Sequence, residues 1–427
     1  MQYDIESIRS AFPALALTDN GKRRIYFDNP AGTQVPRRVT DQMVKCMIEA
    51  NANLGGYFPT SEKADAVMAA ARDTMSDLLN APSANDIIFG QNMTTMTLHV
   101  SRSIGQTMSP GDEIILSRMD HDANVTPWVL LARDLGLVIK WLPFNLETFE
   151  FELDELDKLI TSKTRLLCIG GASNLTGTLH DVKAMCAMAK SANAWTYIDA
   201  VQSVPHVSTD VQDLDCDFLV CSAYKFFGPH QGILYGRREI MQQLRPYKVR
   251  PAPDETPGAY ETGTQSHEGA AGVAAAVDHF AWIGETMAKD YYARNAGFSG
   301  RRQSVHAAMN FLLDYEATLA LHLIEGLQQL PGVRIQGISD PDAMSRRVPT
   351  VSFTVSGDSP DRIAKALAGE NIFVWSGHNY ALEAATVLGI LDRGGAVRVG
   401  PVHYNTVEEI DELLNALDGI ISKRDAA

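Results

Sequence analysis

The sequence predicts an α/β protein with a large domain, built on a mostly parallel sheet between helices, and a smaller α+β domain at the C-terminal end. From about residue 26 to residue 236, short apolar runs alternate with longer segments of helical periodicity. That alternation is typical of parallel strands joined by crossover helices. After residue 286 helices and strands mix in another order. With 427 residues the chain is long enough for both domains.

Seven apolar runs are the expected strands of the large domain. They cover residues 87–89, 113–116, 137–142, 165–170, 195–199, 217–222 and 232–236. Because these runs are apolar throughout and do not alternate with polar residues, the sheet should be covered on both faces. Among the helices between them, residues 61–80 carry apolar side chains at helical spacing behind Ser61, which suits an N-cap.

The later part of the chain divides into an irregular stretch and a second domain. Residues 245–269 are rich in proline and glycine and predict an excursion from the core. Beyond a helix-rich stretch, strands are expected at 348–355, 372–376 and 396–400, with helices at 360–371 and from Val407 onward. We expect an N-terminal segment (1–24) packed on the small domain, a large domain (25–285) and a small domain (286–427).

Composition excludes several classes of partner. The chain has 37 Lys and Arg against 52 Asp and Glu, a formal charge of -15, which disfavours nucleic acid and anionic membrane surfaces. No run approaches the roughly 20 apolar residues of a membrane span, and the start MQYDIESIRS does not resemble a signal peptide. We therefore expect a cytoplasmic protein without nucleic-acid or membrane partners.

The cysteines predict neither disulfides nor a metal site. There are 5 of them, an odd number, and they are scattered without C-x-x-C spacing. Cys168 and Cys221 fall in apolar strand runs and should be small buried hydrophobic residues.

The stretch SAYKFFGPHQG, residues 222–232, places Lys225 at the end of an expected buried strand. Such a lysine either extends its amine to water or pairs it with a charged or polar partner inside the protein. In an open parallel sheet, ligands bind beyond the carboxyl ends of the strands, so other strand ends should hold that partner. Asp199 closes one strand, and His121 and Asn174 follow two others. Taken alone, each is better explained as a cap or turn residue.

Together these strand ends have the complement of one cofactor. A helix that opens at Met93 and Thr94 offers free N–H groups to a phosphate. Ser222 and Lys225 add a hydroxyl and an amine, Asp199 would pair with a ring cation, and a histidine ring could stack on a planar group. A phosphate, a protonated ring and an aldehyde that forms a Schiff base with lysine describe pyridoxal 5'-phosphate.

Several segments also resemble a known family. They are IYFDNPAGTQVP (25–36), DHDANVTPW (120–128), YIDAVQS (197–203), SAYKFFGP (222–229), YETGT (260–264) and VRVGPVHYNTVEEID (397–411). In this order they resemble the class V aminotransferases, and most of all the cysteine desulfurases and selenocysteine lyases. The resemblance runs from about residue 20 to the C-terminus. It implies the pyridoxal-phosphate fold type I and a homodimer with the active site at the subunit interface.

The resemblance also implies roles for single residues at the cofactor ring. Lys225 would form the Schiff base and act as the base, Asp199 would pair with the pyridinium nitrogen, and His121 would stack on the ring. Gln202 and Asn174 would lie near the phenolic oxygen.

Other roles implied by the resemblance lie at the phosphate and at the substrate. The phosphate would be held by the Met93 backbone, Thr94, Ser222 and Tyr224, with Thr264 from the partner subunit. Arg398 would bind the substrate carboxylate, a task that its planar fork suits. Asn29, His378 and Tyr380 would lie beside the substrate. Two alternatives stay open: Tyr380 could equally pack beside Trp375 at the domain interface, and Thr264 could equally cap a helix that starts near Gln265.

Two positions depart from the family pattern. Tyr224 replaces the histidine that usually precedes the lysine. More important, the loop WSGHNYA, residues 375–381, keeps Gly377 and His378 but has Tyr380 where the family has a nucleophilic cysteine. A phenol with a pKa near 10 does not replace a thiolate.

The sequence therefore predicts a pyridoxal-phosphate enzyme that acts on a small α-amino acid, as a C–S or C–Se lyase without a persulfide cysteine. An aminotransferase and an amino-acid racemase or epimerase of the same family are alternatives. A further alternative is an inactive scaffold or binding protein. Joint retention of Lys225, Asp199, His121 and Arg398 disfavours it, because a binding surface alone has no need of buried charges and an amine nucleophile.

Overall fold

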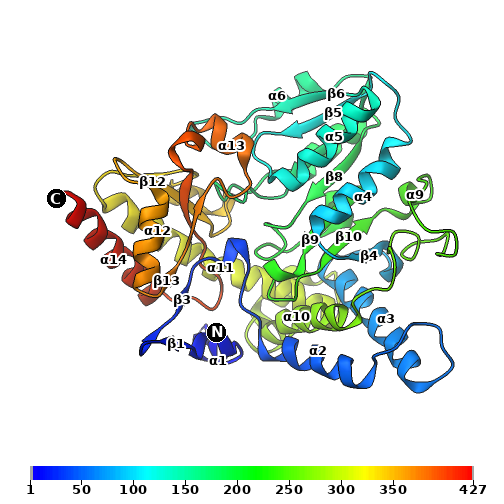
Figure 1. Ribbon diagram of the computed structural model, residues 1–427, viewed down its shortest axis with the longest axis horizontal. Coiled ribbons are helices and arrows are strands. Elements are labelled where there is room, and N and C mark those ends of the chain that lie inside the picture. Colours follow the sequence, from blue (N-terminus) through cyan, green and yellow to red (C-terminus); the bar gives the residue numbers. More distant parts are fainter. Residues whose placement is uncertain (1–2, 426–427) are drawn as a thin grey trace.

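The large lobe of the protein is built on a seven-stranded sheet (Figure 1). The structure, a computed structural model, describes residues 3–425, and the side chains as far as residue 423. In spatial order the strands are β4 (Ile87–Gly90), β10 (Gly232–Gly236), β9 (Phe218–Ser222), β8 (Trp195–Asp199), β7 (Thr164–Gly170), β5 (Glu113–Ser117) and β6 (Val138–Leu142). β10 runs antiparallel to both of its neighbours, β4 and β9, and the other neighbouring pairs in this sheet are parallel. The prediction of a mostly parallel sheet is confirmed.

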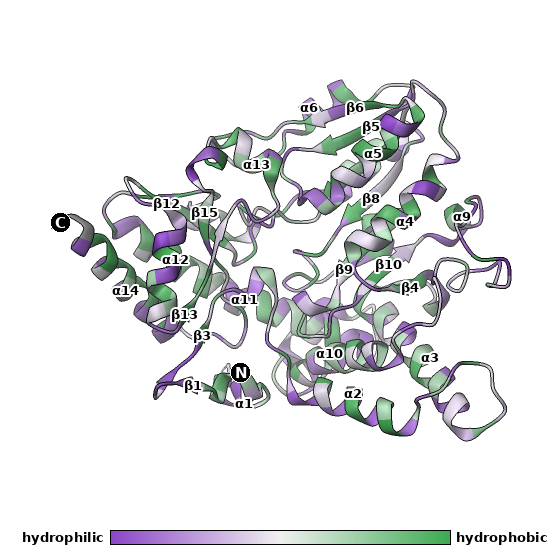
Figure 2. Cartoon of the chain, viewed as in Figure 1, coloured by the Kyte–Doolittle hydropathy of each residue, from purple (hydrophilic) through white to green (hydrophobic). Residues whose placement is uncertain are grey.

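Helices cover both faces of this sheet, as the continuous apolar runs predicted. One face packs on α2 (Arg37–Glu49), α3 (Pro59–Leu79), α7 (Val182–Ser191), α10 (His267–Thr286) and the first half of α11 (Gly300–Gln329). The other face packs on α4 (Met93–Gly105) and α5 (Thr126–Leu135). β5 lies between the two layers and is drawn largely in the hydrophobic colour in Figure 2.

Helix α3 begins earlier than predicted, and Ser61 is not its cap. The helix starts at Pro59 behind Phe58, because a proline fits the first helical position, where no backbone N–H is needed. The Ser61 hydroxyl donates to Asn53 O at 2.6 Å and accepts the N–H of Gly56 at 2.7 Å. Ser61 therefore fastens the α2–α3 loop to the helix.

The small lobe carries a second sheet, in the order β11 (Val333–Ile335), β12 (Val351–Val355), β15 (Ala396–Val399) and β14 (Trp375–Gly377), with antiparallel neighbours. Helices α12 (Pro360–Gly369) and α14 (Val407–Asp425) pack beside it. The prediction of a single strand at 372–376 is wrong. This segment holds two strands, because the chain changes partner at Val374: β13 (Ile372–Phe373) is parallel to β3 (Ile25–Tyr26), and β14 pairs with β15.

The two lobes share helix α11. Its first half, including Leu312, joins the apolar core of the large lobe, and its second half, including Leu319 and Leu327, joins that of the small lobe. This packing favours a domain boundary inside α11, and the boundary expected at residue 286 stays a prediction. The N-terminal segment contacts the chain just before and within α14, where Tyr3 donates to His403 O at 2.6 Å. Residues 1, 2, 426 and 427 lie outside the described part.

Two of the cysteines are buried in strands, as the sequence predicted. Cys168 and Cys221 are fully buried in strands, and all five cysteines are free. Among residues 3–425, no helix has the length and apolar character needed to cross a membrane.

Candidate active site

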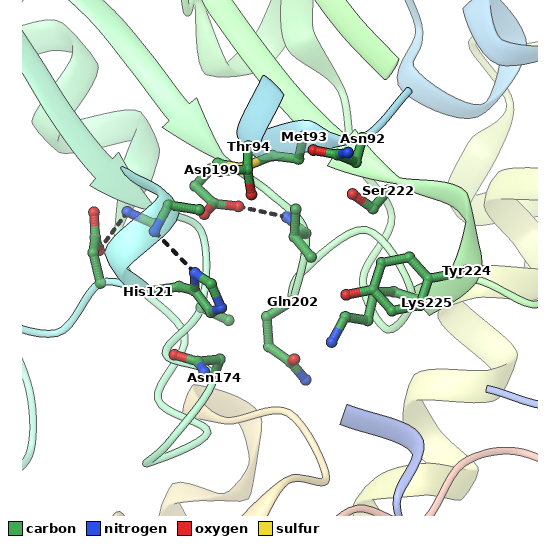
Figure 3. Close-up of a pocket in the computed structure, with 15 residues that line it drawn as sticks. Asn92, Met93, Thr94, His121, Asn174, Asp199, Gln202, Ser222, Tyr224 and Lys225 are labelled. Carbon is green, nitrogen blue, oxygen red and sulfur yellow. Dashed lines mark hydrogen bonds between the residues drawn. The ribbon is translucent and has the colours of Figure 1, made fainter. Parts of the chain in front are cut away.

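A cavity lies at the carboxyl ends of β7, β8 and β9, beside the start of α4 (Figure 3). It brings together the predicted residues Met93, Thr94, His121, Asn174, Asp199, Gln202, Ser222, Tyr224 and Lys225. In Figure 3, His121 faces Lys225 and Tyr224 across the cavity, while Thr94 and Ser222 lie along one edge. The rest of its wall is formed by Asn92, Asp120, Ala123, Gly170, Ala172 and Val201.

Lys225 turns into this cavity and is only partly exposed. It follows β9 in a short 3-10 turn, its Nζ donates to Pro30 O, and it lies 4.9 Å from the centre of the Tyr224 ring. Burial, with the nearby Arg398 charge, lowers the pKa of Lys225 to about 7. A substantial fraction of the amine is therefore unprotonated at neutral pH, which is the form that attacks an aldehyde.

Asp199 ends β8 as a buried carboxylate. Its Oδ1 accepts the N–H of Val201 at 3.0 Å. Burial raises the pKa of Asp199 to about 6, and the Lys225 charge opposes that rise. No ion pair within residues 3–425 satisfies this carboxylate, so a cation inside the cavity would stabilise its charged form.

His121 presents a neutral, flat ring to the cavity. Its Nδ1 accepts the N–H of Ala123 at 3.0 Å, which assigns the proton of the neutral ring to Nε2. Burial, together with the charges of Lys225 and Arg398, lowers the pKa of His121 to about 3. The ring therefore stays uncharged at neutral pH and is suited to stacking on a planar group.

The N-terminus of α4 forms an anion-binding edge of the cavity. The Asn92 side chain caps the helix at the N–H of Thr95, 2.9 Å away, and leaves the first N–H groups without partners inside the helix. Gly232 of β10 lies against this turn, since a Cβ there would stand 2.5 Å from the Asn92 carbonyl carbon and 2.8 Å from Met93 N. The turn thus fits a phosphate, which both the N–H groups and the helix dipole favour.

Arg398 lies behind Asn174 and holds unused hydrogen-bonding capacity. One guanidinium nitrogen donates to Asn174 O at 2.9 Å, but Nε is buried without a partner in the described chain, as is Asn174 Oδ1. Burial lowers the pKa of Arg398 to about 10, so it stays charged at neutral pH. Buried unsatisfied groups of this kind are rare and suit a ligand carboxylate.

Five predicted residues are not brought to the cavity wall, namely Asn29, Thr264, His378, Tyr380 and Arg398. Asn29 donates to Gly400 O at 2.7 Å and to Tyr26 O at 3.0 Å, and its Oδ1 accepts the Tyr404 hydroxyl, so the chain itself uses this side chain. Gln202 reaches the wall, but its amide donates to Thr350 Oγ1 at 2.9 Å.

Thr264 lines a separate hollow beside His230 and does not cap α10. That cap is Ser266, which accepts the N–H of Gly269 at 3.1 Å. His378 and Tyr380 lie on the loop after β14, where His378 Nδ1 accepts the N–H of Tyr380 at 3.0 Å.

Two carboxylates at or beside the site were missed from the sequence. Asp120 accepts hydrogen bonds from Ser117, Asn124 and the N–H of Gly170 at 2.7–2.8 Å, and burial raises its pKa to about 7. Asp28 has one buried oxygen without a partner in the described chain, and burial raises its pKa to about 6 against the Arg398 and Lys225 charges. Asp120 directly precedes His121 and Asp28 directly precedes Asn29 in the sequence. These neighbours were the signal that could have identified both carboxylates.

Comparison with known proteins places these features in a family. The family model of the class V aminotransferases matches residues 25–299 and 303–413. A cysteine desulfurase of Pectobacterium atrosepticum is 31% identical over 98% of both chains. The aminotransferase-like protein FGM3 of Gibberella zeae is 31% identical over 98% of this chain and 99% of its own.

Solved structures agree with this match. A cysteine desulfurase of Thermococcus onnurineus NA1 superposes with a TM-score of 0.85 at 26% identity, and one of Escherichia coli with 0.82 at 26%, each covering 99% of both chains. The predicted fold type I is confirmed, and the cavity residues fit pyridoxal 5'-phosphate, the cofactor of this family. The chain belongs to the class V aminotransferases, enzymes that depend on pyridoxal phosphate, and within them it is cysteine desulfurase-like.

Proposed function

We propose that this enzyme acts on a small α-amino acid as a C–S or C–Se lyase that uses no persulfide cysteine. The observation that carries the proposal is the convergence of Lys225, Asp199 and His121 with the start of α4 in one cavity. Arg398 lies beside them with a buried guanidinium nitrogen that has no partner in the described chain.

The residues divide the work by position. Lys225 would hold the cofactor through its aldehyde, and its free amine would take the proton from the substrate Cα. Bound pyridoxal phosphate supplies an electron sink for the charge left at that carbon. Asp199 would hold a proton at the ring nitrogen, which its carboxylate favours. Arg398 would orient the substrate through its carboxylate.

The cysteines support a mechanism without a persulfide. No cysteine lines the cavity, and all five are buried. Burial raises the pKa of the Cys168 and Cys216 thiols well above the ordinary value, and that of Cys186 to about 12. Thiols of this kind are poor nucleophiles at neutral pH. Sulfur would then leave as free sulfide.

A transaminase is the second candidate. A transaminase would use the same proton abstraction at Cα but would transfer the amino group and release no β-substituent. The 31% identity to an aminotransferase-like protein, over nearly the whole chain, supports transamination as this second candidate. A racemase or epimerase would return the proton to Cα.

We propose that the enzyme is a homodimer and that Thr264 completes the phosphate site of the other subunit. Thr264 does not reach the cavity of its own chain. Several large apolar side chains on α2 and the loop that follows it are exposed, namely Val44, Met47, Ile48, Leu54, Tyr57 and Phe58. Large exposed apolar patches mark interaction sites. We also propose a cytoplasmic location, since five free thiols suit a reducing compartment.

The test is a screen of amino acids with the purified enzyme loaded with pyridoxal phosphate. Keto acid, ammonia, sulfide or selenide and the enantiomer of the substrate are measured in parallel. A lyase yields pyruvate, ammonia and sulfide or selenide from cysteine-like or selenocysteine-like substrates. A transaminase yields a keto acid without free ammonia, and a racemase only the enantiomer. Absence of the visible Schiff-base absorbance would contradict every enzymatic alternative.

A further inference from the structure

The loop that follows β14 has a constrained backbone. Asn379 and Tyr380 adopt successive left-handed conformations, with φ of 51° and 60°. Non-glycine residues adopt this conformation at a cost, and it persists where surrounding contacts determine it. Gly395 packs directly on the backbone of Gly377, where a Cβ would overlap with it. The base of the loop is therefore fixed against β15.

Contacts to the large lobe hold the tip of the loop. Tyr380 O accepts the N–H of Asp122 at 2.8 Å. Asn379 O accepts the side-chain amide of Asn174 at 2.7 Å. Just beyond the loop, Glu383 forms an ion pair with Arg118. These contacts join the small lobe to the two segments that supply His121 and Asn174 to the cavity.

The Tyr380 ring lies flat against His121. The ring centres are 5.3 Å apart and the planes differ by 12°. His121 lines the cavity and Tyr380 does not, so the tyrosine contacts the imidazole from outside the cavity wall. The tyrosine is 65% exposed, and within residues 3–425 its hydroxyl has no hydrogen-bond partner. The contact therefore depends on the ring and not on the hydroxyl.

We infer that Tyr380 is a positioning residue for His121 and does not bind the substrate directly. The phenol ring on one side and the Ala123 N–H on Nδ1 hold the imidazole plane parallel to the space that a planar ligand would occupy. This inference rests on the proposed function, because a fixed imidazole plane matters only if a flat cofactor stacks on it.

The experiment compares Tyr380→Ala, Tyr380→Phe and the control Trp375→Ala in the full-length enzyme. Trp375 is an exposed aromatic residue on the adjacent β14, 51% exposed, and lies outside the cavity wall. The readouts are the dissociation constant of pyridoxal phosphate and the visible circular dichroism of the bound cofactor. The cofactor is achiral, so its dichroism reports how rigidly the protein holds it.

Tyr380→Ala should weaken cofactor binding about five-fold, the worth of one aromatic pair, and reduce the visible dichroism. Tyr380→Phe and Trp375→Ala should stay within about two-fold of the wild type. In a His121→Ala background, Tyr380→Ala should have no further effect, since the two residues act as one unit.

Equal results for Tyr380→Ala and Trp375→Ala would overturn the inference. So would a Tyr380→Phe variant that raises KM with unchanged cofactor binding, because the hydroxyl would then contact the substrate. Either outcome leaves the proposed function intact. Loss of the Schiff-base absorbance in the wild type would instead contradict the proposed function itself.

Discussion

At the scale of single residues, the chemistry depends on charges that the fold keeps out of water. Lys225, Asp199 and Arg398 each have a pKa moved toward the neutral form by burial. Burying charged groups costs desolvation free energy, and a protein that served only as a binding surface would gain nothing from burying them. The charged forms of these side chains become favourable when a phosphate, a protonated ring and a carboxylate occupy the cavity between them.

Replacement of Lys225 should separate cofactor binding from chemistry. In Lys225→Ala the phosphate edge at α4 remains, so the enzyme should still bind pyridoxal phosphate but without the visible Schiff-base absorbance. Turnover should fall by several orders of magnitude, because nucleophile and base are lost together. Lys183→Ala, which removes a surface ion pair with Asp213, is the control and should keep full turnover. Ordinary activity in Lys225→Ala would refute the assignment.

The absence of a thiol on the Tyr380 loop gives a second prediction at this scale. After incubation with cysteine, mass spectrometry should find no added sulfur on residues 371–405. Tyr380→Cys should gain at most weak desulfuration, since Trp375 and Asn379 surround a phenol and not a thiol. Persulfide on Cys46, Cys168, Cys186, Cys216 or Cys221 during turnover would show that another cysteine supplies the nucleophile.

At the scale of elements, the close approach of β10 to α4 shapes the phosphate edge. Gly232→Ala would place a methyl group against the Asn92 and Met93 backbone and must displace the helix start. We expect a loss of about 1–3 kcal/mol in the free energy of unfolding, together with weaker cofactor binding. Gly419→Ala in α14, where nothing lies within 4 Å of the added Cβ, should instead stabilise the protein slightly. Urea unfolding and cofactor titration measure both.

The strands of the large sheet, and the gathering of their terminal residues at one edge, could be predicted from the sequence for a physical reason. Continuous apolar runs identify buried strands, and parallel strands end at a common edge, so the strand pattern alone places Asp199 and Lys225 together. Contacts between distant segments could not be predicted. The β3–β13 pairing and the ring of Tyr380 on His121 depend on how the small lobe packs, which no local pattern encodes.

At the scale of the whole molecule, two subunits should share each site. Lys225→Ala and Thr264→Glu should each be inactive alone, the second because a carboxylate would repel the phosphate. If Thr264 serves the partner's cavity, mixed dimers contain one intact site, and random mixing should restore about a quarter of wild-type activity. Subunits are mixed under exchange conditions and assayed with the identified substrate. No recovery in mixtures shown to contain heterodimers would contradict the shared site.

The histidines buried where the lobes meet should make stability depend on pH. His279 Nε2 and His403 Nε2 lie 3.1 Å apart, and both rings are fully buried. Burial lowers the pKa of His403 to about 3 and that of His279 well below its ordinary value. In the unfolded chain these histidines bind protons with the ordinary histidine pKa of about 6.5. In the folded protein they stay unprotonated at that pH, so protonation favours the unfolded chain. Stability is full above that pH and falls below it.

Each histidine should reduce the free energy of unfolding by up to about 1.4 kcal/mol per pH unit as the pH falls from about 6.5 toward 3. A double variant, His279→Gln with His403→Gln, should be less stable at neutral pH but lose much less stability between about pH 7 and pH 5. His322→Gln is the control, because His322 is partly exposed beside Asp411 and stands outside this pair. Urea unfolding at each pH measures the slopes. An unchanged slope in the double variant would show that other groups set the acid sensitivity of this fold.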